Sequence, residues 1–172
     1  MKRFLVFAFV LCSASLFAQG SLEKGKAQIN AGIGVTTWGV PIYAGFDVGV
    51  HEWITVGGKV SYRSYGGGRF GGVRYKQSLT TIGANGNFHF NELLDLPSKW
   101  DLYAGLSLGY YIWSDVRWND GNNTYVYGGE ASGLGAEVQA GARYFFTDKF
   151  GVNAELGGGT GTGLTFGVTI KL

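Results

Sequence analysis

The closing stretch Gly163-Leu-Thr-Phe-Gly-Val-Thr-Ile-Lys-Leu172 alternates strictly between apolar residues and small or polar ones. The even-numbered positions, from Leu164 to Leu172, are all apolar, and the odd-numbered positions are glycine, threonine or lysine. A period of two places successive side chains on opposite faces of an extended strand. The stretch therefore predicts a β-strand with one wholly apolar face and one small, polar face.

The same alternation recurs along most of the chain. Between residues 100 and 113, every second residue from Leu102 to Ile112 is apolar, and glycine, serine, tyrosine and aspartate lie between them. Strands are bounded where this pattern gives way to glycine, asparagine and proline. The pattern predicts eight strands, near residues 27–38, 41–51, 53–65, 75–90, 100–113, 133–146, 149–158 and 163–172.

Alternation alone also fits a soluble sandwich or a lipocalin-like barrel, so the contents of the two faces decide. One face is aliphatic or aromatic over about ten residues, the length of a strand that crosses a membrane at a tilt. The other face mixes Gly, Ser, Thr, Asn and isolated charges, which is typical of a polar barrel interior. Closure follows, because an open sheet edge in lipid leaves backbone groups unpaired. We predict an all-β fold, an eight-stranded antiparallel up-and-down transmembrane β-barrel.

Composition agrees with one membrane-embedded domain. Only 15% of the 172 residues are charged, against about a quarter in typical soluble proteins. The formal net charge is +2 and the basic residues form no stripe, so we expect no nucleic-acid partner.

Residues 1–18 have the pattern of a cleaved signal peptide. A positively charged start is followed by the apolar run Phe4–Leu11 and a more polar run that ends at Ala18. We expect cleavage after Ala18, which leaves residues 19–172 as the barrel. Cys12, the only cysteine, follows a leucine where a lipoprotein signal has a small residue, so we expect no lipid attachment and no cysteine in the mature chain.

Connector lengths divide the predicted barrel into two ends. The links around residues 51–52 and 147–149 are short, whereas Gly66–Arg74 and Ser114–Ser132 are long and rich in Gly, Asn and Tyr. Short periplasmic turns and longer outer loops are expected of bacterial outer-membrane barrels. Gly66–Gly71 also matches G-x-G-x-x-G, but it leads to a strand rather than a helix, so we expect no nucleotide site.

Several stretches resemble small outer-membrane barrels of the OmpX/OmpA type: Leu96-Pro-Ser-Lys-Trp-Asp-Leu-Tyr-Ala-Gly105, Gly141-Ala-Arg-Tyr-Phe-Phe146, Ala154-Glu-Leu-Gly157 and the closing strand. In that family the last strand usually ends in an aromatic residue, whereas this chain ends in Leu172. The resemblance implies a location in the Gram-negative outer membrane and contact with the barrel-assembly machinery during biogenesis. It leaves open structural, adhesive, porin-like and enzymatic roles.

Charged residues on the polar face predict a network inside the barrel. The pleat assigns four acidic and four basic side chains to the lumen: Asp47, Lys59, Arg63, Asp101, Glu137, Arg143, Glu155 and Lys171. The lumen of an eight-stranded barrel is only wide enough for side chains to fill it, and an isolated buried charge is costly. We therefore predict that these charges pair, with Asp101, Arg143, Glu155 and Lys171 close together near the periplasmic end.

Two further groups of residues face the membrane or its surface. Aromatic residues at the predicted strand ends form candidate interfacial girdles, namely Trp38, Trp53, Tyr62, Phe90, Trp100, Tyr110, Trp113, Phe146 and Phe150. The second outer loop is basic, and Arg69, Arg74 and Lys76 are candidates for contact with lipopolysaccharide phosphates. We also expect the barrel to contact outer-membrane lipid and to be a monomer.

The chain offers little support for catalysis, cofactors or metals. His51 and His89 both fall near predicted periplasmic turns, without a second ligand at metal-binding spacing. We therefore expect a non-enzymatic outer-membrane protein with a structural or surface-interaction role and a lumen closed by side chains. The alternative is a narrow porin-like channel for ions or small solutes.

Overall fold

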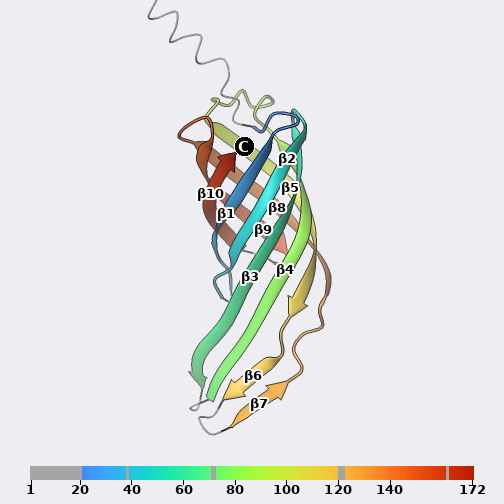
Figure 1. Ribbon diagram of the computed structural model, residues 1–172, viewed down its shortest axis with the longest axis vertical. Coiled ribbons are helices and arrows are strands. Elements are labelled where there is room, and N and C mark those ends of the chain that lie inside the picture. The colour runs from blue at the N-terminus through green and yellow to red at the C-terminus, as the bar shows by residue number, and fades with distance from the viewer. Residues whose placement is uncertain (1–20, 38, 71–72, 120–122, 162) are drawn as a thin grey trace, which may run out of the picture.

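The computed structural model describes residues 21–172 except 38, 71–72, 120–122 and 162 (Figure 1). The predicted signal peptide, Cys12 and Trp38 lie outside the described residues. The described strands are β1 (Ala27–Val35), β2 (Ile42–His51), β3 (Ile54–Phe70), β4 (Val73–His89), β5 (Trp100–Trp113), β6 (Val116–Asn119), β7 (Thr124–Tyr127), β8 (Gly133–Phe145), β9 (Phe150–Gly159) and β10 (Gly163–Lys171). The described part of the chain contains no helix long and apolar enough to span a membrane.

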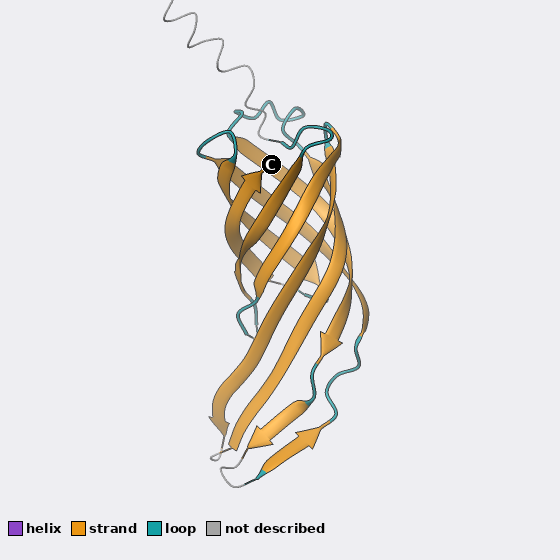
Figure 2. Ribbon diagram, viewed as in Figure 1, coloured by secondary structure: helices purple, strands orange, loops and turns teal. Residues whose placement is uncertain are grey.

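Eight of these strands close into an antiparallel barrel (Figure 2). Their order is β3-β2-β1-β10-β9-β8-β5-β4, and pairing of β3 with β4 completes the ring. Each strand pairs with the strand that precedes it and the one that follows it around the barrel, and β1 pairs with β10, for example at Ala31 and Val168. The predicted eight-stranded up-and-down barrel is therefore confirmed.

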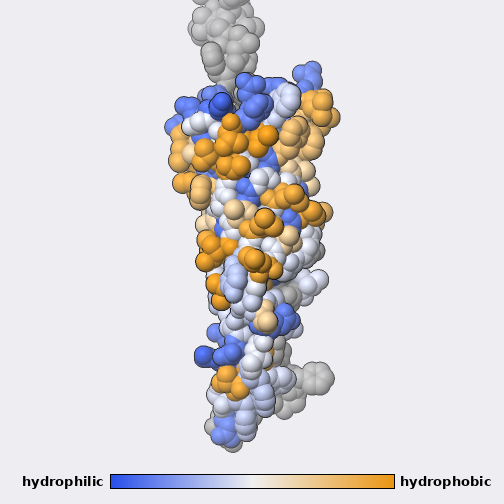
Figure 3. Space-filling model, turned by 90° about the vertical axis from the view of Figure 1, so that its right-hand side faces the viewer, coloured by the Kyte–Doolittle hydropathy of each residue, from blue (hydrophilic) through white to orange (hydrophobic). Residues whose placement is uncertain are grey.

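The two faces of the wall have the predicted contents. Val168 is 40% exposed, whereas its neighbour Thr169 is fully buried. Leu106 and Leu108 point outward at 63% and 68% exposure. Figure 3 shows hydrophobic residues gathered over the barrel wall and hydrophilic residues toward both ends. Buried side chains are mostly polar, because the interior holds Gln, Asn, Thr and charged residues in place of a hydrophobic core.

The barrel has two unlike ends. The terminal end carries Leu172, the segment Ser21–Lys26 and the connections β2–β3, β4–β5 and β8–β9. The hairpin end carries the other connections, and there β3 and β4 continue well beyond the remaining barrel strands (Figure 1). β6 pairs with β4, and β7 with β6, so that a four-stranded sheet projects from this end.

Two predicted loops are therefore wrong in part. Residues 66–70 and 73–74 lie in strands rather than in a loop, with a register shift between Gly66 and Arg69. Residues 114–132 contain the β6–β7 hairpin. Glycine and asparagine suggested loops here, but neighbouring strands supply hydrogen-bonding partners that local sequence does not reveal.

Inward glycines make room for large side chains that cross the lumen. Tyr103 is the cross-strand partner of Gly141, and a Cβ atom added at Gly141 would lie 2.4 Å from the Tyr103 ring. An aromatic ring over a glycine of the adjacent strand is a recurrent device for holding curved sheets in register.

Candidate functional site

Arg143 lies at the centre of a buried charged layer inside the barrel. Its Nη1 donates to Asp101 Oδ2 at 2.9 Å and its Nη2 to Asp47 Oδ2 at 3.0 Å. The Arg143 side chain is 3% exposed, and its guanidinium carbon lies 4.1 Å from the centre of the Tyr103 ring. A buried cation needs such partners, because removing it from water is costly.

This layer spans the lumen. Arg143 is on β8 and Asp47 on β2, and three strands separate β2 from β8 in either direction around the ring. Their side chains thus meet from opposite sides of the barrel.

Amide side chains complete the coordination of the Asp47 carboxylate. Gln28 and Asn30 donate to its Oδ2 at 3.0 and 2.9 Å, and Asn85 donates to its Oδ1 at 2.9 Å. These donors come from three further positions on β1 and β4. Because a buried polar group without a hydrogen bond is costly, the three amides stabilise the buried carboxylate of Asp47.

His89 also belongs to this layer, although the sequence predicted only that it lies near a periplasmic turn. Its Nδ1 lies 2.6 Å from Asp101 Oδ1, and its Nε2 lies 3.0 Å from Thr55 Oγ1. Since an ionised carboxylate only accepts hydrogen bonds, Nδ1 carries the proton that it shares with Asp101. The missed signal was the pleat itself: Asn85, Asn87 and His89 share one parity on β4 and all face inward.

Thr55, His89 and Asp101 have the hydrogen-bonding order of a nucleophile, a base and an orienting acid. Thr55 and His89 are both buried. Within the described part of the chain, the lumen contains two cavities, and neither residue lines them. A nucleophilic hydroxyl must reach a substrate atom. The arrangement therefore orients Asp101 toward Arg143 rather than offering a reactive hydroxyl.

A second ion pair crosses the lumen nearer the hairpin end. Lys59 Nζ lies 2.7 Å from Glu155 Oε1, and Tyr103 Oη donates to Glu155 Oε2 at 2.9 Å. Lys59 is on β3 and Glu155 on β9, which are again separated by three strands in either direction. Glu155 therefore pairs with Lys59, where the sequence analysis placed it beside Asp101, Arg143 and Lys171.

The remaining predicted lumen charges lie at the two ends. Toward the hairpin end, Glu137 accepts a hydrogen bond from Tyr111 and interacts electrostatically with Arg63. At the terminal end, Lys171 Nζ lies 4.1 Å from the centre of the Phe145 ring and 3.4 Å from the Ser21 carbonyl oxygen. The structure thus brings Asp101 and Arg143 into direct contact, Lys171 interacts with both electrostatically, and Glu155 pairs instead with Lys59.

The segment Ser21–Lys26 covers the terminal end of the lumen. Leu22 is 2% exposed and Ser21 8%. The Gly25 amide donates to the Gly49 carbonyl at 2.7 Å, and the Gly49 amide donates to the Lys26 carbonyl at 2.9 Å. This short segment shows no alternation, so its sequence does not predict its position over the lumen.

Two cavities bordered by charged side chains remain in the lumen, of about 70 Å³ and about 30 Å³. A cavity needs about 10–15 Å³ to hold one water molecule, so both cavities are large enough to contain water. Tyr43, Lys59 and Glu155 border both cavities. The Lys59–Glu155 pair therefore separates an outer chamber from an inner one, and Arg143 borders only the inner chamber.

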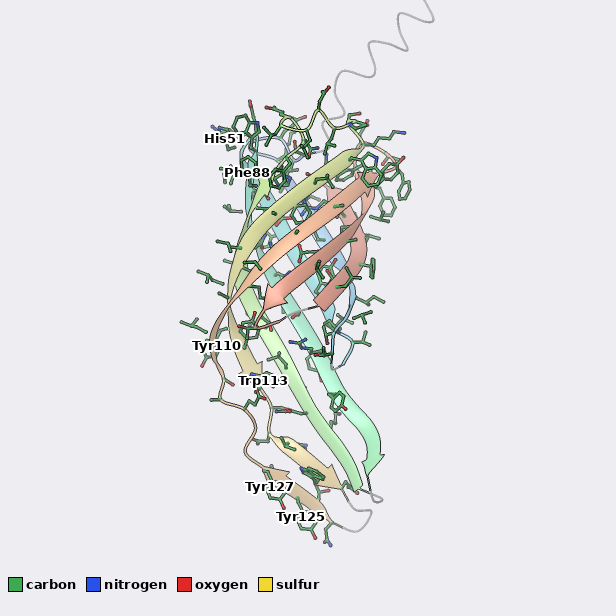
Figure 4. All side chains as sticks on the ribbon, turned by 180° about the vertical axis from the view of Figure 1, so that it is seen from behind. His51, Phe88, Tyr110, Trp113, Tyr125 and Tyr127 are labelled. Carbon is green, nitrogen blue, oxygen red and sulfur yellow. The ribbon has the colours of Figure 1, made fainter. Side chains whose placement is uncertain are left out.

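Aromatic side chains form contact chains around the terminal end. Trp53, Phe88 and Phe90 contact one another in sequence with ring centres 6.2 and 5.1 Å apart. A second chain joins Trp100, Tyr144, Phe146 and Phe150. Toward the hairpin end, Tyr62 and Tyr110 are 43% and 47% exposed, and Figure 4 shows Tyr110 and Trp113 far along the barrel from His51 and Phe88. Their role at membrane interfaces stays a prediction.

The candidate basic surface gains one residue that sequence analysis missed. Arg69 and Arg74 are cross-strand partners, but their side chains lie outside the described part of the structure. Lys76 is exposed and pairs with Arg117 of β6. Arg117 was missed because it lies far away in the sequence and only the β4–β6 pairing brings it beside Lys76.

Comparisons with known proteins identify solved structures that have a similar architecture. No family model and no curated protein sequence matches the chain. Among solved structures, Yersinia pestis Ail in complex with the heparin analogue sucrose octasulfate aligns with a TM-score of 0.59 at 12% identity, covering 87% of this chain and all of Ail. Neisserial surface protein A aligns at 0.55 and 16% identity, covering 86% of this chain and 95% of that protein.

The N-terminal β-barrel domain of Pseudomonas aeruginosa OprF aligns with a TM-score of 0.52 at 14% identity, covering 86% of this chain and 96% of that domain. All three are small barrels, and the alignments span almost their whole length. At these identities the likeness concerns the fold. The chain therefore has the fold of the small eight-stranded outer-membrane β-barrels, as its resemblance to the OmpX/OmpA type implied.

Proposed function

We propose that the chain is a non-enzymatic integral protein of the Gram-negative outer membrane, with a structural and surface-contact role and a lumen closed by side chains. Two ion pairs support the proposal of a closed lumen. Arg143–Asp47 and Lys59–Glu155 each join opposite sides of the barrel. Ions that enter the outer chamber meet both layers in succession.

The apolar wall supports a position within a lipid bilayer. Outward residues such as Leu106, Val138 and Phe166 are 63%, 59% and 48% exposed, and contiguous apolar surface of this extent is unfavourable in water. In this arrangement the terminal end lies in the periplasm and the hairpin end outside the cell. The barrel-assembly machinery would insert the chain after removal of residues 1–18.

The projecting sheet β3-β4-β6-β7 supports a surface-contact role. Trp118, Tyr125 and Tyr127 are 38%, 46% and 58% exposed, and Figure 4 shows Tyr125 and Tyr127 at the far tip of the molecule. Lys76 and Arg117 lie side by side on this sheet. Ail was crystallised with a sulfated sugar analogue, and we propose that this chain likewise contacts anionic saccharides, with lipopolysaccharide as the nearest source.

Single-cysteine labelling on intact cells tests the placement. The only native cysteine is Cys12 in the predicted signal peptide, so an introduced cysteine would be the only thiol of the mature chain. A membrane-impermeant maleimide should label Val126→Cys on intact cells, and should label Lys149→Cys only after the outer membrane is permeabilised. Equal labelling of both variants on intact cells would contradict the orientation.

A narrow channel is the second candidate, and the two lumen cavities favour it. Water in the chambers on either side of Lys59 and Glu155 would become continuous if that pair separated. The Arg143 layer would still have to open. Swelling of proteoliposomes that contain the wild-type protein in an isotonic glycine solution would favour the channel, whereas unchanged volume supports the closed barrel.

A further inference from the structure

An apolar groove lies on the outer wall near the hairpin end. Its volume is about 500 Å³, and its lining includes Gly39, Val40, Ile42, Tyr62 and Gly66. Val40, Ile42 and Tyr62 are 61%, 56% and 43% exposed. Ligand pockets commonly measure about 300–1,000 Å³, so the groove has the size of a site for one apolar chain.

The groove exists because neighbouring strands end at different heights. Ile42 begins β2 and pairs with Tyr62, while β3 continues to Phe70. Gly39, which precedes β2 and has φ +71°, lies against the Ser64 carbonyl of this extension. The lining residues that the structure describes carry no charge and include the hydroxyl groups of Tyr62, Ser64 and Tyr65.

Two cations lie beside the part of the groove that is farther from the barrel wall, near Gly66, and they project from the same face of the sheet as Gly66. Gly66 pairs with Lys76, and Lys76 pairs with Arg117. Paired residues project to the same face, and adjacent strands lie about 4.8 Å apart. The backbones of Lys76 and Arg117 are therefore about 5 and about 10 Å from that of Gly66, within reach of their long side chains.

The heights of the two parts match a lipid at a membrane interface. Gly66 follows Tyr62 by four positions on β3, which corresponds to about 13 Å along the strand. At a strand tilt of about 40°, this amounts to about 10 Å along the membrane normal. Tyr62 is a predicted interfacial residue, so Lys76 and Arg117 lie just above the hydrocarbon, where phosphate groups are found.

We propose that the groove and the Lys76–Arg117 pair form one binding site for a phosphorylated, acylated glycolipid of the outer leaflet. This inference rests on the proposed contact with anionic saccharides and adds the acyl chain as the second determinant. One acyl chain packs between Val40, Ile42 and Tyr62, and a phosphate binds to Lys76 and Arg117. A phosphate monoester carries about −1.5 to −2 charges at pH 7, which balances two cations, whereas a phospholipid diester carries a single charge.

Native mass spectrometry of the full mature chain in detergent micelles tests the site, with hexa-acylated lipopolysaccharide of short core as the probe. The variants are Lys76→Glu with Arg117→Glu, and Val40→Glu, which places a carboxylate in the groove. Matched controls at the terminal end are Lys99→Glu with Lys149→Glu, and Val50→Glu. Heat-modifiable gel mobility verifies that every variant is folded.

Both site variants should bind the intact glycolipid at least tenfold more weakly than the wild type, and both controls should bind as the wild type does. The delipidated core oligosaccharide and phosphatidylglycerol should each bind at least tenfold more weakly than the intact glycolipid. If Val40→Glu binds normally while Lys76→Glu with Arg117→Glu does not, the groove is wrong and the saccharide contact stands. If neither variant loses binding, both the glycolipid site and the proposed saccharide contact fail. If phosphatidylglycerol binds as tightly as the intact glycolipid, the preference for a glycolipid is wrong.

Discussion

Arg143 Nη2 lies 3.0 Å from Asp47 Oδ2, although the two residues belong to strands on opposite sides of the barrel. The contact therefore does more than join neighbours in a sheet: it joins opposite walls of the lumen at this height. Asp101 and His89 extend the same layer on β5 and β4. A single guanidinium group thus connects a layer of side chains from β2, β4, β5 and β8.

Removal of that group should destabilise the fold. Arg143→Ala leaves Asp47 and Asp101 buried without their counter-ion, and the loss of one member of a buried pair costs about 3–5 kcal/mol. Urea unfolding in lipid vesicles, followed by tryptophan fluorescence, measures the change. Lys99→Ala, at an exposed position of the β4–β5 connection, should change the free energy of unfolding by no more than about 0.5 kcal/mol.

Adjacent residues on β10 should respond differently to substitution. Val168→Arg and Leu106→Arg place a charge in the apolar wall, which costs about 2–4 kcal/mol at the bilayer midplane. Thr169→Ala removes a hydroxyl that donates to Asn30 and accepts from Asn153, which costs about 1 kcal/mol. Heat-modifiable gel mobility after folding into bilayers compares them, and equal losses at positions 168 and 169 would contradict the assignment of faces.

The contact of Tyr103 with Gly141 should make that glycine intolerant of substitution. In Gly141→Ala the added methyl group would overlap the Tyr103 ring, which lies 2.4 Å from the ideal Cβ position, and overpacking of this kind costs about 1–3 kcal/mol. Gly86→Ala is the matched control, since no heavy atom lies within 4 Å of its ideal Cβ position. Similar unfolding midpoints for the two variants would show that Tyr103 moves aside.

Processing of the N-terminus gives a separate prediction. Intact-mass analysis of protein purified from outer membranes should give Gln19 as the first residue, without lipid. A diacyl adduct on Cys12 would show that the segment is a lipoprotein signal.

The barrel could be predicted from sequence because its period is simple and global. A strict alternation in β5, β8 and β10 fixed both the strands and the side that each residue faces. The same parity rule would have placed His89 on the inward face that Asp101 shares. It was obscured because His89 is the last residue of β4, where a turn explained it equally well.

The pairing of charges could be predicted only in part. Asp101 and Arg143 are direct cross-strand partners, so the order of strands and a count along them bring the two together. Lys59–Glu155 and Arg143–Asp47 cross the lumen, and their meeting depends on barrel diameter, strand tilt and side-chain length. Local sequence carries no information on those quantities. The β6–β7 extension could not be predicted for a similar reason, because it depends on the pairing of β6 with β4.

The most direct test of the closed lumen is single-channel recording in planar bilayers. The account predicts no steady conductance for the wild-type barrel, because Arg143–Asp47 and Lys59–Glu155 cross the lumen in two successive layers. It predicts measurable current from folded Arg143→Ala combined with Lys59→Ala, in which both cross-lumen pairs are lost. Steady wild-type conductance that is unchanged in the double variant would contradict the account and establish the channel.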